Sequence, residues 1–247
     1  MKNIKFILVL IFCFNIYNLG AQDLAEKDSD SLKVRNIFLK SSLIPLSMIT
    51  LGIVANNSQF EKDLRYDIRA KVGNDFQFVI DDYFQLVPIA EMYIADALGV
   101  KAKNHWFDQS KYLFISNVIS ASITQGLKRI TLKKRPDNST NDSFPSGHTT
   151  FSFTNASVLM HEFRDSSPVL AYSGYLFSTT TATFRMLNDR HWISDVLVGA
   201  GIGILATEMV YYLEPLKNFN PFKKNENINL VPMIDQNSKG FYFSYTF

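Results

Sequence analysis

The sequence predicts an all-α protein, a bundle of about six core helices followed by a short C-terminal β-hairpin. Two observations lead to this fold class. Apolar residues make up 47% of the 247 residues, and they gather in segments long enough for helices that show little of the every-second-residue alternation typical of strands. The six segments cover residues 37–54, 84–98, 111–127, 149–163, 168–187 and 193–213.

The first residues are typical of an export signal. Lys2 and Lys5 precede an apolar run at residues 6–14, and the small residues Gly20 and Ala21 follow. The run is shorter than a membrane span, which favours cleavage near residue 22, and retention as a first membrane anchor is the alternative. The single cysteine lies inside this segment, so the mature chain would contain no disulfide.

The C-terminal segment differs in composition from the rest. Apolar stretches at 228–234 and 241–247 flank a turn that contains Gly240, which predicts a β-hairpin. We expect it to pack on the bundle; a terminal aromatic strand is also typical of outer-membrane barrels, but a lone hairpin cannot close one. The expected division is a signal peptide or anchor (1–22), a helical domain (23–220) and a tail (221–247).

Charge excludes one class of partner. The net charge of +2 comes from 25 basic and 23 acidic residues, and no basic run is interleaved with stacking aromatic residues, so we expect no nucleic-acid partner.

The hydropathy leaves the relation to a membrane open. Only residues 41–60 and 166–184 run uncharged for 18 or more positions, and the mean hydropathy of −0.01 is low for a membrane protein. Carboxylates such as Glu91 and Glu208 can nevertheless face the interior of a membrane bundle. With a cleaved signal and six spans, the end of the third helix would lie in the cytoplasm. A site facing outward therefore requires a retained signal, or helices buried in a peripheral or soluble domain, and we favour the latter.

Three separated pieces of sequence carry the residue types that phosphoryl transfer needs. That reaction concentrates negative charge on three equatorial oxygens, so fixed positive charge does much of the catalysis. Lys128, Arg135 and Arg185 can supply it, and arginine can grip phosphate with two parallel hydrogen bonds. The pieces are Lys128-x6-Arg135-Pro136, Pro145-Ser146-Gly147-His148 and Arg185-x5-His191-x3-Asp195.

The second piece predicts a helix start that can bind an anion. Ser146 is a plausible N-cap, and Gly147 lets the backbone approach a ligand. The free N–H groups of the first turn would then face a phosphate.

The third piece predicts a paired histidine. His191 and Asp195 are four residues apart, a spacing that brings a carboxylate to an imidazole on a helix. Asp195 would orient the ring, leaving the other nitrogen free to attack phosphorus. His148, when protonated, could donate to the leaving oxygen and later activate water. A satisfied core His–Asp pair is the structural alternative.

Other polar residues receive plainer interpretations. Arg129, Lys133 and Lys134 are expected to be solvated surface cations, and His105 and His161 to be structural or surface residues. No histidine, cysteine or carboxylate cluster has metal-ligand spacing, so we expect no metal and no other cofactor.

The three pieces resemble the signature of the type 2 phosphatidic acid phosphatase superfamily, which also includes bacterial class A acid phosphatases and vanadium haloperoxidases. The resemblance covers about residues 37–213, and the residues near His191 are similar to exported Gram-negative members. One departure is Phe184, where the family usually has a small residue. The resemblance implies phosphate binding by Lys128, Arg135, Ser146, Gly147 and Arg185, with His148 as general acid, His191 as nucleophile and Asp195 as its orienting partner.

The function expected from these observations is a metal-independent phosphatase acting outside the cytoplasmic membrane, in the periplasm or at its membrane face. The apolar helices favour a phosphorylated lipid, and the family implies phosphatidic acid, phosphatidylglycerophosphate, isoprenyl pyrophosphate or lipid A as candidates. A soluble periplasmic acid phosphatase of broad specificity is the alternative. A vanadium haloperoxidase or a non-catalytic membrane protein are less favoured.

Overall fold

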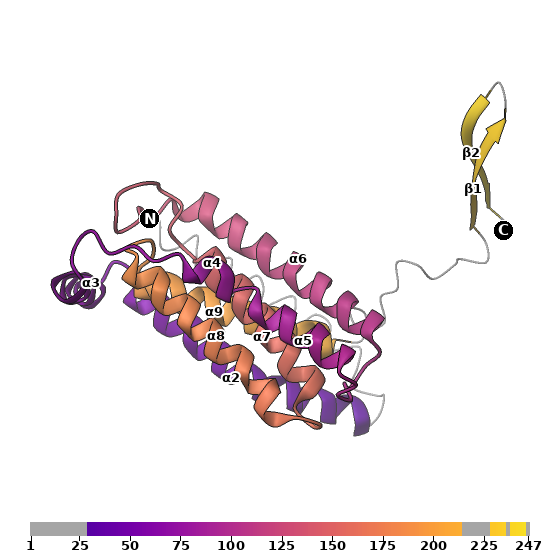
Figure 1. Ribbon diagram of the computed structural model, residues 1–247, viewed down its shortest axis with the longest axis horizontal. Helices are drawn as coiled ribbons and strands as arrows, with labels where there is room; N and C mark the ends of the chain where they lie inside the picture. The colour runs from indigo at the N-terminus through magenta and orange to yellow at the C-terminus, as the bar shows by residue number, and fades with distance from the viewer. Residues whose placement is uncertain (1–28, 214–227, 236–237, 246–247) are drawn as a thin grey trace.

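The computed structural model describes residues 29–213, 228–235 and 238–245, and its first part is a bundle of helices (Figure 1). Each of the six predicted segments contains a helix, so the helical class is confirmed. The helices are α2 (Ser29–Ala55), α3 (Gln59–Val72), α4 (Ile80–Phe84), α5 (Val87–Ala97), α6 (Trp106–Thr131), α7 (Gly147–Phe163), α8 (Pro168–Leu187) and α9 (Ile193–Tyr212).

Helices α3 and α4 were not among the predicted segments. α3 is polar, so it lacks the apolar run by which the other helices were recognised. Its N-terminus nevertheless carries a capping signal, because the Ser58 hydroxyl accepts from the Glu61 N–H at 3.2 Å and Glu61 Oε1 accepts from the Asn57 N–H at 2.5 Å. A serine followed three residues later by glutamate is the sequence pattern that could have revealed this helix.

Helix α7 lies at the centre of the bundle and packs against α6, α8 and α9, while α2 packs along α9. Two glycines of α9 permit a close approach to α7. A Cβ atom at Gly199 would lie 2.8 Å from the Ser146 carbonyl oxygen, and one at Gly203 would lie 2.6 Å from the Thr150 carbonyl oxygen. Small residues allow helix backbones to approach closely, so the start of α7 is held against α9.

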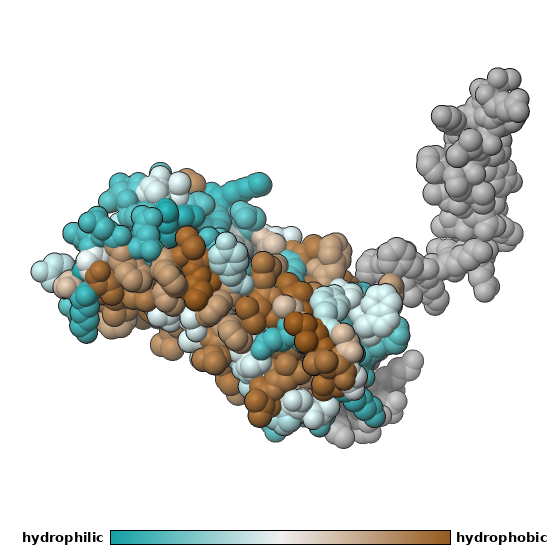
Figure 2. Space-filling view, viewed as in Figure 1, coloured by the Kyte–Doolittle hydropathy of each residue, from teal (hydrophilic) through white to brown (hydrophobic). Residues whose placement is uncertain are grey.

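One face of the bundle carries a large apolar area (Figure 2). Figure 2 shows hydrophobic side chains over its middle and hydrophilic ones gathered at the end that carries α3 and the loop after α6. Large side chains that are about two-thirds exposed or more project from α2, α6 and α8. They include Leu43, Ile44, Val54, Phe114, Val169 and Leu176.

Among the residues that the structure describes, two helices are long and apolar enough to cross a membrane, judged by length and composition. They are Arg35–Ala55, with a mean hydropathy of 1.8, and Ile193–Tyr212, with 1.6. The second is 78% buried inside the bundle, as a core helix of a soluble protein would be, whereas the first is only 28% buried. Because most of α2 is exposed, its apolar face is stronger evidence for membrane contact than the apolar sequence of α9.

Beyond residues 214–227, which lie outside the described part, the backbone of β1 (Ile228–Asp235) pairs antiparallel with β2 (Ser238–Tyr245). The structure describes the backbone of both strands but not their side chains. Residues 1–28, which include the expected signal, also lie outside the described part. The C-terminal hairpin as a stable element, its packing on the bundle and the signal all stay predictions.

Candidate active site

Backbone hydrogen bonds join the second and third sequence pieces at one end of the bundle. The Ser146 N–H donates to the Asp195 carbonyl oxygen at 3.0 Å, and the His191 N–H donates to the Arg185 carbonyl oxygen at 3.2 Å. The Ser143 hydroxyl, from the loop between α6 and α7, donates to the Asp195 carboxylate. The start of α7 is thus attached to the start of α9, beside the end of α8.

The first piece supplies two cations to the same place. Lys128, in the last turn of α6, is buried, and its ammonium donates to the Asp142 carbonyl oxygen. Arg135 lies in the following loop, where its Nε donates to Asp142 Oδ1 at 3.0 Å. Arg185 of α8 is close enough to Lys128 for their charges to repel. Three cations therefore lie together, and such a set can bind an anion.

Arg185 is also incompletely paired. Its side chain is buried, and one terminal nitrogen donates to Asp81 Oδ2 at 2.8 Å. Its Nε has no hydrogen-bond partner within the described part of the chain. A buried donor without a partner is costly, and a bound phosphate oxygen would satisfy it.

The helix start at Ser146 is arranged as predicted. Ser146 is the N-cap of α7, and its hydroxyl oxygen accepts from the Thr149 hydroxyl at 2.9 Å. A Cβ atom placed on Gly147 would meet nothing within 4 Å. The backbone at Gly147 therefore borders open space, where the first N–H groups of the helix can reach a ligand.

His191 and Asp195 form the predicted pair. His191 Nδ1 lies 3.4 Å from Asp195 Oδ2, and both side chains are buried. Burial lowers the pKa of His191 to about 4, and Arg185 and Lys128 act in the same direction against the opposing effect of Asp195. The ring is therefore neutral at physiological pH, and Nε2 is the nitrogen left to act as a nucleophile.

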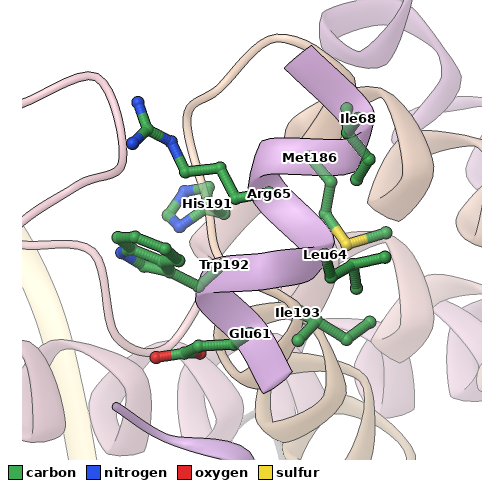
Figure 3. A pocket seen from close by; sticks show the side chains of 8 residues that line it. All are labelled: Glu61, Leu64, Arg65, Ile68, Met186, His191, Trp192 and Ile193. Atoms are coloured by element: carbon green, nitrogen blue, oxygen red, sulfur yellow. The ribbon is translucent and has the colours of Figure 1, made fainter. Parts of the chain in front are cut away.

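His191 also lines a small pocket beside α3, together with Trp192, Ile193 and Met186 (Figure 3). The wall contributed by α3 consists of Glu61, Leu64, Arg65 and Ile68. Arg65 fixes this helix to the His191 loop, because its guanidinium donates to both Asp189 oxygens at 2.8 and 2.7 Å. A helix that the sequence did not predict thus borders the candidate nucleophile.

The prediction that Lys133 is a solvated surface cation is wrong. Its side chain is buried, and the ammonium lies 3.1 Å from Glu61 Oε1 and 3.1 Å from Asp195 Oδ1. The physical reason is that α3 brings the buried Glu61 to this position, which a local pattern does not reveal. The neighbouring Arg129 and Lys134 are exposed, as predicted.

Two carboxylates that sequence reasoning missed also reach the site, both from α4. Asp81 pairs with Arg185, and Asp82 Oδ1 lies 2.9 Å from His148 Nε2. About one hundred residues separate Asp81 from Arg185, and an acidic pair in a short segment carries no recognisable motif. His105 and His161 take no part in the site: His105 caps α6, and His161 pairs with Glu208 at 3.0 Å.

Comparisons with known proteins identify a family that matches part of this chain. Residues 109–219 match the PAP2 superfamily, and this stretch contains every predicted site residue but none of α3 or α4. A lipid A 1-phosphatase of Porphyromonas gingivalis is 30% identical over 178 residues, which are 70% of this chain and 38% of that protein. This chain therefore spans well under half the length of that relative.

A solved structure has a similar fold. A transmembrane PAP2-type phosphatidylglycerolphosphate phosphatase from Bacillus subtilis is 16% identical and superposes with a TM-score of 0.51, covering 73% of this chain and 99% of that one. LpxE of Aquifex aeolicus is 20% identical, with a TM-score of 0.46 and coverage of 63% and 96%.

Proposed function

We propose that this chain is a member of the PAP2 superfamily, which its residues 109–219 match. It would be a hydrolase that removes phosphate from a phosphorylated membrane lipid through a phosphohistidine intermediate. The observation that carries this proposal is the convergence of buried Lys128 and Arg185 on the neutral imidazole of His191. The helical domain at 23–220 would be the catalytic unit.

In the first step, His191 Nε2 attacks phosphorus and forms a P–N bond while the bond from phosphorus to the leaving oxygen breaks. Protonated His148 gives its proton to that oxygen, so a neutral alcohol, or a phosphate from a pyrophosphate, departs. In the second step, water attacks phosphorus and His148 takes its proton. The P–N bond breaks, inorganic phosphate leaves, and both histidines regain their starting states.

Positive charge and oriented donors stabilise the transition state in this scheme. Lys128, Arg135 and Arg185 would bind the non-bridging oxygens, together with the first N–H groups of α7 at Ser146 and Gly147. Such fixed donors act where charge accumulates and need no reorganisation during the reaction. Asp195 would orient His191 and stabilise the positive charge on its ring when the P–N bond forms.

A lipid is the favoured substrate because of the apolar surface around the site. Phe78, Val79 and Tyr83, beside the α4 carboxylates, are each at least half exposed. An acyl chain or a membrane interface would cover such side chains. The lipid A 1-phosphatase of P. gingivalis makes the 1-phosphate of lipid A the first substrate to test, with phosphatidylglycerophosphate as the second.

We further propose that the protein is exported and works at a membrane, with its polar end and active site facing the periplasm. The exposed apolar face of α2 supports membrane contact. Partitioning of the full chain between detergent and buffer tests it. Recovery in the buffer phase would instead favour a peripheral or soluble enzyme.

The activity is tested by measuring phosphate release in EDTA from lipid A and phosphatidylglycerophosphate in mixed micelles, beside a soluble aryl phosphate. Release from a lipid at more than about ten times the aryl rate supports the proposal, and vanadate should inhibit by mimicking the transition state. Similar rates would favour an acid phosphatase of broad specificity. Loss of activity in EDTA, or no release from any substrate, would contradict the proposal.

A further inference from the structure

Helix α4 brings a carboxylate to the candidate general acid. Asp82 Oδ1 lies 2.9 Å from His148 Nε2, and its neighbour Asp81, which is buried, pairs with Arg185 at 2.8 Å. Both contacts come from a segment outside the stretch that matches the superfamily. The mechanism proposed above does not use Asp82.

A second set of contacts holds this segment in place. The ring of Phe78 lies 5.6 Å from that of Phe184, measured between centroids. Asn188 holds the Phe78 backbone from both sides, accepting from its N–H at 2.9 Å and donating to its carbonyl oxygen at 2.8 Å. The Asn188 amide also donates to Asp81 Oδ1 at 3.1 Å. Phe184 stands where the resemblance leads one to expect a small residue, and here it anchors the segment that carries Asp82.

His148 faces opposing charges. Asp82 Oδ1 lies 2.9 Å from the ring and 4.0 Å from the Arg185 guanidinium, so charges of both signs act on the imidazole. Burial and Arg185 lower the pKa of His148, whereas Asp82 and Asp81 raise it. Without a carboxylate, the imidazolium beside an arginine would lose its proton at a lower pH, and a general acid must carry its proton to act.

We propose that Asp82 is a positioning residue for His148 and that the Phe78–Phe184–Asn188 contact holds it in place. The inference rests on the proposed function. Asp82 keeps His148 protonated and fixes its ring, so that the other ring nitrogen is free to face the leaving oxygen. A carboxylate is known to orient a catalytic histidine through a hydrogen bond to one ring nitrogen. Here Asp82 would do this for the general acid His148, as Asp195 would for the nucleophile His191.

The test is the pH dependence of kcat/KM for lipid phosphate release, whose basic limb reports the general acid in the free enzyme. Asp82→Asn should move that limb to lower pH, reducing kcat/KM at pH 7.5 about three- to tenfold while the acidic limb stays in place. Asp82→Glu should restore the limb in part, and Phe184→Ser should move it in the same direction as Asp82→Asn by a smaller amount. Asp67→Asn, which removes an exposed carboxylate from α3, is the matched control and should leave the limb unchanged.

Two results would overturn the inference. One is an active Asp82→Asn enzyme with an unmoved basic limb. The other is a variant with tighter vanadate inhibition and an unmoved limb, which would make Asp82 a competitor of phosphate for Arg185. A histidine NMR titration, with His148 assigned by His148→Gln, measures the pKa without turnover. An inactive wild-type enzyme would therefore count against the proposed function, and an unchanged His148 pKa in Asp82→Asn would count against this inference.

Discussion

The ammonium of Lys133 lies 3.1 Å from Asp195 Oδ1, on the carboxylate oxygen opposite to the one nearest His191. The Lys133 ammonium also lies 3.1 Å from the carboxylate of Glu61. The Ser194 hydroxyl bridges Lys133 and Glu61, because it accepts from the ammonium at 2.7 Å and donates to the carboxylate at 2.6 Å. The partner of the candidate nucleophile is thus part of a buried charge network that includes α3.

Lys133→Met should destabilise the fold and weaken catalysis. Removing the cation leaves the buried carboxylates of Glu61 and Asp195 close together without compensation, and breaking a buried pair in this way costs about 3–5 kcal/mol. Thermal unfolding in detergent measures the loss. The double variant Glu61→Gln/Lys133→Met should recover part of it, and the exposed Lys134→Met should change nothing. A wild-type Tm for Lys133→Met would show that the network contributes no stability.

His191→Ala should abolish turnover, because no other described histidine lies beside both Asp195 and the cations. Rapid quenching with a ³²P-labelled substrate should show an acid-labile phosphoenzyme in the wild type and none in the variant. His105→Ala, at the exposed cap of α6, is the matched control. Phosphoenzyme in His191→Ala would assign the nucleophile to another residue.

Asp195→Asn should keep substrate binding while reducing kcat by about 10²–10⁴-fold, the range expected when a histidine loses the carboxylate that sets its tautomer and stabilises its charge. Steady-state kinetics separates the two effects. A variant with a large rise in KM and an unchanged kcat would instead make Asp195 a residue that shapes phosphate binding.

The pH profile of kcat/KM should be bell-shaped with an acidic optimum. His191 must be neutral to attack, and its pKa is lowered to about 4, so the rate should rise as the pH increases through that value. His148 must be protonated to donate, and its pKa is lowered from 6.5, so the rate should fall before pH 6.5. The maximum is therefore expected between the pKa of His191, about 4, and pH 6.5. In the pH profile of kcat, both limbs should lie at higher pH, because the bound phosphate group stabilises the protonated form of each histidine. A rate that still increases above pH 8 would contradict these roles.

The sequence predicted the parts of the protein that have a local signature. Six helices were predicted from continuous apolar segments, because such a segment can be recognised without knowing which distant residues it packs against. The eight candidate site residues were predicted from residue types and spacing within three short pieces, and from the family that those pieces resemble. Their roles stay predictions. The polar helix α3 was not predicted, because a surface helix lacks a continuous apolar run. Ser58 and Glu61 nevertheless carry the capping pattern that marks its start.

The sequence by itself determined the helical class and the chemical groups available for phosphoryl transfer. Only the tertiary structure decided how those groups are charged and oriented, since Lys133 pairs with Glu61 across 72 positions and His148 with Asp82 across 66. Electrostatic interactions depend on distance and burial rather than on separation along the chain. A buried pair between distant segments therefore becomes visible only when the helices are packed.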